Sequence, residues 1–333
     1  MKAGASFQAI PYSAEMAAEW DRVVAAAHGG TVLHSRRFLD YHGRRFRDLS
    51  LVAKVPGTAE IAMVFPLAAD RKDAELAVSH PGSSFGGIVS LSREPVDQRA
   101  FLSASAAWLR DNGFRKLLYH MTPPPLLRQP DDGLLPRLIR LGRVVQLDLW
   151  SVLTLGGDLK KRSYWRTEIG KAERKGLRAD PVTTQADWEA LHVVVSARLA
   201  QKYGRTIVHS VAELIALNTR LGAQSRGLLI RAASGEVLAG MWFIDYGTGT
   251  LHNQYIGATD QGLELRASTF GLSVVLEQAC AEGFRLFSFG RSTLEDGFTE
   301  NHDLLRFKSR FGAGLASQFH IEVPLEALAE SGN

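Results

Sequence analysis

The sequence predicts an α/β protein with a mixed sheet, built from two similar halves. Helical patterns, with apolar residues three or four positions apart, alternate with short apolar segments typical of strands along all 333 residues. The order of these patterns in the first half returns in the second. A chain of this length corresponds to about two domains. We therefore expect one domain at residues 1–150 and the other at 151–333.

In the first half, helices and strands are marked by capping residues and by apolar segments. A helix is expected at 35–46, where Ser35 is a typical N-cap, and another at 95–114, which begins at a proline and ends at an Asn-Gly pair. Strands are expected at 49–55, 61–69, 75–80, 116–121 and 144–155. The first three of these strands are expected to form an antiparallel meander.

The second half has the same rhythm. Helices are expected at 185–204, 210–224 and 265–284, and strands at 227–233, 237–247, 250–258, 285–290 and 316–323. The turns "SGE" and "GTG" separate the first three strands, so these are expected to form an antiparallel meander. A mixed sheet with helices on its faces is the natural packing for both halves.

The two halves resemble copies of one another. The segment "DNGFRKLLYH" aligns with "AEGFRLFSFG", which places Gly113 and Gly283 at equivalent positions 170 residues apart. The segment "SHPGSSFGG" likewise takes the place of "QYIGATDQG", so His80 and Tyr255 correspond. A chance likeness between two βαβ units is the alternative interpretation.

Composition and charge limit the classes of function. The net charge is +4 and the pI about 9.2, and the excess of positive charge is concentrated in "KKRSYWRTEIGKAERKGLR" at 160–178. This segment can bind phosphate, or it can be an ordinary solvated helix face. The single cysteine, Cys280, excludes a disulfide framework and is expected to be a buried, inert thiol.

Several motifs are missing from the sequence. There is no metal-binding spacing of the histidines, no P-loop and no GxSxG motif, so we expect no metal and neither an ATPase nor a hydrolase. No secretory signal begins at Met1 and no apolar segment is long enough to span a membrane. The expected location is the cytoplasm, with no membrane span.

Four segments together carry a family resemblance: "HSRRFLDYHGRRFRDLSLV", "VSHPGSSFGGIV", "KRSYWRTEIGKAERKGL" and "FSFGRSTLEDGFTENHDLLRFKSRFGA". In this order they resemble the FemAB-like branch of the GNAT superfamily, from about residue 34 to about residue 323. The resemblance implies two tandem GNAT-like domains, at 1–150 and 151–333, with most of the site in the second. It also implies transfer of an acyl group to an amine, from acyl-CoA in some members and from aminoacyl-tRNA in others.

Amide formation requires a group that accepts the proton of the amine. Glu295 and Asp296 follow the end of the strand at 285–290, where their carboxylates can face the open edge of the sheet. We expect one of them to be the base, acting directly or through water. The alternative is that they stabilise the N-terminus of the following helix, as acidic residues do without any catalytic role.

Lys308 lies four residues after Leu304 and borders the apolar stripe of the helix near 301–309. An ammonium in that position can bind a carboxylate or phosphate, or stabilise an oxyanion. Fem-type ligases have a functional lysine in a similar F-K segment, and the resemblance implies the same role for Lys308. The alternative is a lysine that covers apolar surface with its stem.

Other polar residues are expected to contact the substrates. They are Arg291, Ser292 and Asn301 after the strand at 285–290, and His80 in the first half. Gly290 lets a ligand approach the backbone, and Arg291 suits carboxylate or phosphate. By the resemblance, Tyr255 is a candidate for protonating a leaving thiolate; a core role is the alternative. A structural role is also the alternative for His80.

The donor site departs from the usual GNAT pattern. Most GNAT enzymes hold the CoA pyrophosphate with a Q/R-x-x-G-x-G/A loop, whereas the matching stretch "TDQGLELRASTFG" offers Arg266 without the two-glycine spacing. Arg166 and Lys171 in the basic segment are expected to supply phosphate contacts instead. Trp165 can stack on a base or belong to the core.

We therefore predict an N-acyltransferase that acts on a primary amine of a sugar, amino acid or peptide. No bound cofactor is expected, and acyl-CoA is the first expectation for the donor. The alternative is a Fem-type ligase that uses aminoacyl-tRNA and binds the tRNA acceptor stem. A different class remains as well: a degenerate GNAT pair that only binds an anionic ligand.

Overall fold

The structure, a computed structural model, describes residues 7–55, 57–156 and 159–330. It contains two compact units. Unit 1 consists of Met1–Leu149, Thr293–Glu300 and Ala316–Asn333, and unit 2 of Trp150–Ser292 and Asn301–Leu315. The chain passes from unit 1 to unit 2 near residue 150, and two later segments belong to unit 1 again.

Unit 1 combines short strands with helices around one apolar core. Its helices are α1 (Ala17–Ala26), α2 (Arg36–Leu39), α3 (Pro95–Asp111), α4 (Leu135–Leu141) and α11 (Leu325–Glu330). Its strands are β1 (Ile10–Pro11), β2 (Leu51–Lys54), β3 (Ile61–Phe65), β4 (Ala68–Ala69), β5 (Leu76–Val78), β6 (Val89–Ser90), β7 (Lys116–His120) and most of β14 (Gly314–Pro324). They form two arrays, β1-β2-β3-β6 and β4-β5-β7-β14. Phe65, Phe101 and Ile321 are fully buried among them.

Unit 2 is a sheet with helices on both faces. Its helices are α5 (Leu159–Glu173), α6 (Gln185–Tyr203), α7 (Val211–Leu221), α8 (Asp260–Glu264), α9 (Ala267–Ala281) and α10 (His302–Ser309). Its strands run in the order β8-β13-β12-β11-β10-β9. They are β8 (Arg143–Thr154, the last five residues), β9 (Arg178–Pro181), β10 (Ser225–Arg231), β11 (Val237–Asp245), β12 (Thr250–Ala258) and β13 (Leu286–Arg291).

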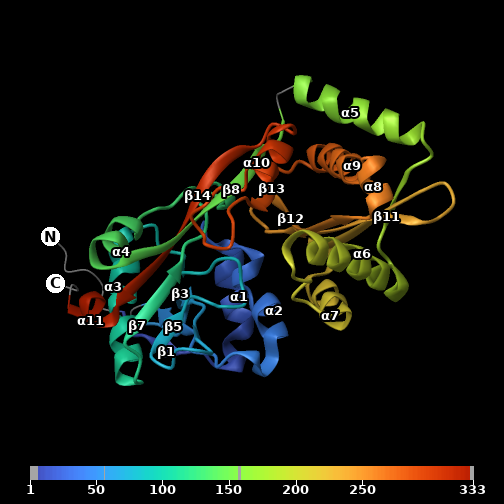
Figure 1. Cartoon of the computed structure of the whole chain (residues 1–333). Helices are drawn as coiled ribbons and strands as arrows, with labels where there is room; N and C mark the ends of the chain where they lie inside the picture. The colour runs from blue at the N-terminus through green and yellow to red at the C-terminus, as the bar shows by residue number, and fades with distance from the viewer. Residues whose placement is uncertain (1–6, 56, 157–158, 331–333) are drawn as a thin grey trace. The chain divides into compact units, whose positions relative to one another are not determined.

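The layers of unit 2 follow from the alternation of side chains along its strands. Gly240 of β11 and Gly257 of β12 face α6, which comes so close that a Cβ on Gly257 would lie 2.6 Å from the Cα of Val195. Met241, the next residue of β11, faces α9 on the other side and touches Gly271. The basic helix α5 packs on the outer side of α9 (Figure 1).

The predicted repeat is visible in the pairing of the strands. In unit 1, α3 leads to β7, which pairs in parallel with β5. In unit 2, α9 leads to β13, which pairs in parallel with β12. Gly113 and Gly283, the residues aligned in the sequence, follow the two helices and have positive φ angles of 90° and 81°. Both helices therefore end in the same left-handed turn.

One strand of each half pairs within the unit that is built mainly from the other half. Strand β8 leaves unit 1 after α4 and pairs antiparallel with β13 of unit 2. Strand β14 leaves unit 2 after α10 and pairs antiparallel with β7 of unit 1. This exchange is why residues 316–333 belong to unit 1, and the sequence pattern alone did not indicate it.

Two predicted elements of unit 1 are wrong in detail. The segment 61–69 is not one strand of a three-strand meander, because β3 ends before Pro66 and β4 pairs with β5 in the other array. Proline has no N–H for a sheet ladder, which accounts for the break. The helix expected at 35–46 is a single α-turn capped by Ser35, followed by 3₁₀ turns that Gly43 interrupts with φ 54° and ψ −124°.

Candidate active site in unit 2

Strands β12 and β13 separate partway along their length. Their parallel pairing ends at His252 and Ser288, although β12 continues to Ala258 and β13 to Arg291. Beyond this point β13 pairs with β8 across a bulge at Phe289. Backbone groups and side chains on the diverging strands are thus freed from the β12–β13 ladder, which makes this part of the sheet a candidate reaction centre.

Lys308 of α10 lies beside the bulge of β13. Its side chain is only 6% exposed, and its ammonium donates to the carbonyls of Gly290 (3.0 Å) and Arg291 (2.8 Å) and to Oγ of Ser292 (2.8 Å). Burial, and secondarily the charge of Arg291, lowers the pKa of Lys308 to about 7. The lysine therefore neither lies on the surface nor offers a free donor to an anion, and it holds the end of β13 in place.

Buried hydroxyl groups and a histidine surround this lysine. Oγ of Ser292 lies 2.8 Å from Oγ of Ser151 on β8. His252, on β12, places Nδ1 3.1 Å from Oγ of Ser288. Burial, followed by the charge of Lys308, lowers the pKa of His252 to about 3, so its imidazole is neutral.

Tyr255 lies on the diverging part of β12. Its hydroxyl is 2.7 Å from Nδ1 of His209, which precedes α7, and its ring stacks on Trp242 with centroids 5.7 Å apart. The backbone carbonyl of His209 is in turn 3.2 Å from Nε2 of His192 on α6. The phenol is thus held by a second titratable side chain that the sequence analysis did not identify.

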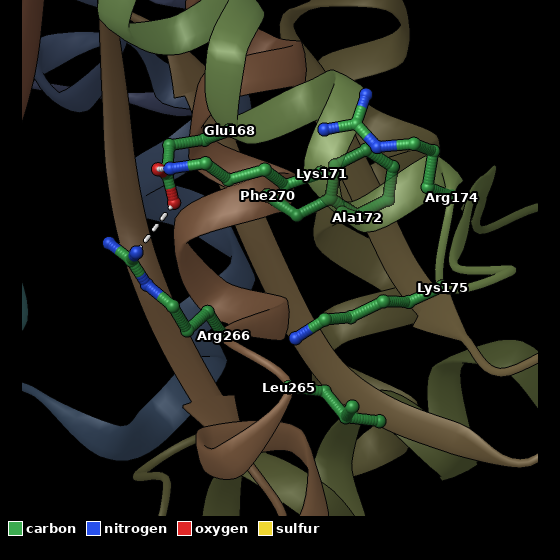
Figure 2. Close-up of a pocket in the computed structure, with 8 residues that line it drawn as sticks. All are labelled: Glu168, Lys171, Ala172, Arg174, Lys175, Leu265, Arg266 and Phe270. Carbon is green, nitrogen blue, oxygen red and sulfur yellow. Dashed lines mark hydrogen bonds and ion pairs between the residues drawn. The ribbon is translucent and has the colours of Figure 1, made fainter.

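A basic pocket of about 300 Å³ opens between α5 and the start of α9 (Figure 2). It is lined by Glu168, Lys171, Ala172, Arg174, Lys175, Leu265, Arg266 and Phe270. The buried carboxylate of Glu168 lies between two of the cations, 2.9 Å from Arg266 and 3.0 Å from Lys171. Two further cations, Arg174 and Lys175, form no ion pair with any residue that the structure describes. The pocket therefore carries an excess of positive charge.

Arg266 is the N-cap residue of α9 and has a left-handed backbone, with φ 61° and ψ 35°. An L-residue other than glycine pays about 1 kcal/mol for this conformation. The side chain of Arg266 does not cap the first N–H groups of α9. The arrangement of a helix N-terminus, Arg266 and the lysines around one pocket suits an anion such as phosphate.

The other residues of the basic segment at 160–178 contribute less to the pocket. Arg166 is 62% exposed and pairs with Glu277 (3.5 Å), outside the pocket. Trp165 is buried in the core of unit 2, so it is not placed to stack on a base. The side chains of Lys160, Lys161 and Arg162 lie outside the described residues.

The acidic pair after β13 is exposed, and it belongs to the segment of unit 1 at Thr293–Glu300. Asp296 accepts hydrogen bonds from the backbone N–H groups of Phe298 (3.0 Å) and Thr299 (2.8 Å) and from the Thr299 hydroxyl. These bonds, that of the Thr299 side chain above all, lower the pKa of Asp296. Asp296 thus stabilises a turn, while Glu295 is exposed beside it. The side chain of Asn301 caps α10 by accepting from Leu304 N (3.1 Å).

His80 lies in unit 1, directly after β5, and is buried with a positive φ of 69°. Its ring lies 4.9 Å from that of His42. Burial, and then the neighbouring His42, lowers the pKa of His80 to about 3. Three of the predicted site residues lie in unit 1: His80, Glu295 and Asp296. The other predicted site residues lie in unit 2.

Comparison with known proteins identifies the fold. Residues 160–303 match the model of the acetyltransferase (GNAT) domain, and none of the curated proteins matches the chain. The structure of FemX is similar over 98% of this chain and 100% of its own, with TM-score 0.68 and 9% identity. L-PGS from Bacillus licheniformis is similar over 94% and 92%, with TM-score 0.60 and 12% identity.

A tandem GNAT protein from the clavulanic acid biosynthesis pathway, solved without AcCoA, is similar over 96% of this chain and 98% of its own, with TM-score 0.53 and 13% identity. The chain has a tandem, FemAB-like GNAT fold. The predicted fold is thus confirmed. The predicted class of enzyme, an acyltransferase, is supported by the match of the GNAT domain.

Several residues of this candidate site were not identified from the sequence. Glu168 lies three residues before Lys171, so the ion pair could have been read from helical spacing. Ser151 and His209 reach their partners Ser292 and Tyr255 from 141 and 46 residues away, and no local pattern marks them. Within the part of the chain that is described, none of the helices is both long and apolar enough to cross a membrane.

Proposed function

We propose that the protein is an N-acyltransferase that moves an acyl group from acyl-CoA to a primary amine of a sugar, amino acid or peptide. The observation that carries the proposal is the basic pocket at the start of α9, within a GNAT domain whose β12 and β13 diverge. Acyl-CoA is a phosphate-rich donor, and the pocket offers it several cations.

The donor phosphate takes the place of Glu168 between the cations of the pocket. Arg266 and Lys171 already bind the carboxylate of Glu168, so their side chains are oriented toward an anion before the donor arrives. Arg174 and Lys175 add charge that no described residue neutralises. A phosphate carries more charge and more acceptor oxygens than a carboxylate, so the pocket favours it.

In the reaction, the amine nitrogen attacks the acyl carbon of the thioester. The C–N bond forms, the C–S bond breaks, and the nitrogen releases one proton to water, which offsets the proton that Tyr255 gives to the sulfur. The sulfur leaves as a thiolate, and the hydroxyl of Tyr255 protonates it, with His209 holding the phenol in place. Asp296 does not serve as the base in this scheme because its carboxylate stabilises a turn.

Donor binding gives the first test. We expect acetyl-CoA and CoA to raise the melting temperature of the protein, because a ligand that binds only the folded state stabilises it. Arg266→Lys keeps a cation in the pocket and retains most of the shift, whereas Arg174→Ala combined with Lys175→Ala reduces it. Transfer of a labelled acetyl group to a panel of primary amines then tests the reaction itself. Binding without any transfer would favour the non-catalytic binding module.

A second candidate is an amide ligase that uses aminoacyl-tRNA. Two observations favour it: the similarity to FemX along the entire fold, and the cations of α5 around a pocket that lacks the usual two-glycine loop. This candidate predicts binding of tRNA that weakens steeply with salt, because phosphate contacts release counterions. Titration with uncharged tRNA and with CoA under the same conditions separates the two donors.

A further inference from the structure

A second pocket, of about 50 Å³, lies within unit 1 at the point where β5 and β7 diverge. The parallel pairing of the two strands ends at Val78 and Leu118, and the next residue of β7, Tyr119, lines the pocket. This point corresponds to the divergence of β12 and β13 in unit 2, so the repeated fold opens at the same place in both units. The pocket has room for roughly three to five water molecules, or for a ligand with as many heavy atoms.

Asp131 gives this pocket a negative charge. The carboxylate accepts from Nε2 of Gln98 (3.1 Å) and from the backbone N–H of Gly133 (2.8 Å), but it has no cationic partner among the residues that the structure describes. His34, which also lines the pocket, is neutral because burial lowers its pKa to about 4. Asp131 is therefore the only ionised side chain among the described residues of the lining. A carboxylate in this setting attracts a cation and repels an anion.

The hydroxyl group of Tyr119 provides a hydrogen-bond donor inside the pocket. Its oxygen accepts from the backbone N–H of Ile88 (2.8 Å), while its hydrogen meets no acceptor in the described part of the chain. The side chain is only 4% exposed. Burial, and to a smaller extent the charge of Asp131, raises the pKa of this phenol, so it keeps its hydrogen. Buried donors in proteins are nearly always satisfied, which indicates an oxygen atom of a ligand at this point.

We propose that the pocket in unit 1 binds a small primary amine that carries an uncharged oxygen, such as an amino alcohol. The ammonium of the ligand donates to Asp131 and to Oε1 of Gln98, whose amide nitrogen already donates to Asp131. The oxygen of the ligand accepts from Tyr119, and its carbon atoms contact Met121 and Leu127. A carboxylate in place of the uncharged oxygen is unfavourable, because it would meet no cation among the described lining residues. The inference concerns unit 1 alone and goes beyond the proposed function.

The experiment titrates the full-length protein with ethanolamine and follows the methyl groups of its five methionines by NMR. Met121 lines the pocket, and its signal is assigned by its absence in Met121→Leu. Ethanolamine should shift the Met121 signal saturably and leave that of Met241, in the core of unit 2, unchanged. Propylamine, which lacks the oxygen, and 1,2-ethanediol, which lacks the ammonium, should each bind about tenfold more weakly or worse, and so should glycine, which carries a carboxylate. A Met121 signal that does not move with ethanolamine, or equal affinities for ethanolamine and any of the other three, would overturn the proposal.

Variants of the lining test the two contacts separately. Asp131→Asn can still accept from Gly133 but loses the charge, so the affinity for ethanolamine should fall about tenfold or more. Asp132→Asn, an exposed neighbour outside the pocket, is the matched control and should bind normally. Tyr119→Phe should bind ethanolamine no better than propylamine. Because this variant also deprives Ile88 of its acceptor, the other methionine signals check that it is folded. Normal affinity in Asp131→Asn would overturn the proposal.

The outcomes distinguish this inference from the proposed function. Arg174→Ala combined with Lys175→Ala alters the basic pocket of unit 2 and should leave the titration of Met121 unchanged. A protein that binds ethanolamine in unit 1 but transfers no acyl group to any amine retains this site and loses the proposed function. A protein that transfers acyl groups while ethanolamine leaves Met121 unshifted retains the function and loses this site.

Discussion

Arg266 combines an unfavourable backbone conformation with a position in the basic pocket. A left-handed residue directly before a helix is normally glycine, so an arginine there indicates that its side chain has a use. The cost of the conformation, about 1 kcal/mol, sets the scale for the first prediction.

We expect Arg266→Gly to separate stability from donor binding. Glycine relieves the backbone strain, so the free energy of unfolding should stay within about 1 kcal/mol of the wild type despite the lost ion pair with Glu168. The affinity for the phosphate-bearing donor should fall about tenfold, which corresponds to about 1.4 kcal/mol. Isothermal titration with CoA measures the affinity, and Arg266→Lys is the control that retains the charge. Unchanged affinity in Arg266→Gly would remove the pocket from the donor site.

Tyr255 gives a second prediction at this scale. Tyr255→Phe keeps the ring on Trp242 but removes the hydroxyl that His209 holds. Because the phenol acts on the leaving group only, kcat should fall about 10- to 100-fold and KM for the donor should change little. Steady-state kinetics with acetyl-CoA checks this. A rise in KM alone would give Tyr255 a binding role instead.

The sequence indicated where polar groups lie along the chain, but it did not indicate which groups they hydrogen-bond to. The sequence marked Lys308 as a lysine beside an apolar stripe, but its partners are two backbone carbonyls and a hydroxyl that depend on the bulge of β13. The alternative interpretation of the acidic pair was that it stabilises the N-terminus of α10. Asp296 does have a structural role, but it stabilises its own turn and not α10. Hydrogen bonds of this kind are decided by tertiary packing, which no local pattern contains.

At the scale of the element, the bulged end of β13 depends on Gly290. This residue has a φ of 72°, and a Cβ there would lie 3.2 Å from Cε1 of His252. Its carbonyl is one of the acceptors of Lys308. The glycine therefore allows both the turn of the strand and the approach of the histidine.

Gly290→Ala should destabilise the protein by about 1–2 kcal/mol, from the left-handed backbone, and should also lower the rate of acyl transfer because the carbonyls around Lys308 shift. Gly283→Ala is the matched control: its φ is 81°, but a Cβ there would meet no atom within 4 Å. It should lose similar stability and keep its turnover per folded molecule. Urea unfolding and initial rates measure the two effects. A normal rate for Gly290→Ala would show that the bulge geometry is not needed.

Elements with a strong pattern were predicted well. The helices that begin at Pro95 and Gln185 and the meander of β10, β11 and β12 lie where the apolar periodicity and the turns placed them. The misplaced elements are short and interrupted. Pro66 divides a continuous apolar run between two strand arrays, and a chain of 3₁₀ turns replaces most of a predicted helix.

At the scale of the whole molecule, four histidines with lowered pKa values make stability depend on pH. Burial is the largest cause that lowers the pKa of His34 to about 4 and the pKa values of His80, His120 and His252 to about 3. Their folded pKa values lie below the unfolded value of 6.5, so the unfolded chain binds more protons as the pH falls. The stability they contribute is complete above pH 6.5 and is lost between 6.5 and these folded values.

We expect the free energy of unfolding to decrease below pH 6.5 by up to about 1.4 kcal/mol per pH unit for each of these histidines. His252→Gln should reduce the slope, since glutamine does not titrate. Urea unfolding at pH 7.5, 5.5 and 4.5 measures it. Constant stability over this range would mean that the histidines accept protons in the folded state.

The exchange of β8 and β14 has a consequence for the order in which a growing chain can fold. A ribosome releases the protein from its N-terminus, and β7 emerges long before its partner: His120 pairs with His320, 200 residues later. Unit 2 needs nothing beyond Leu315, and its borrowed strand β8 is already present when β13 appears. The unit encoded first is therefore the last to be completed. During synthesis, the edge of β7 that pairs with β14 stays unpaired until β14 has been made. An unpaired strand edge can meanwhile pair with other chains.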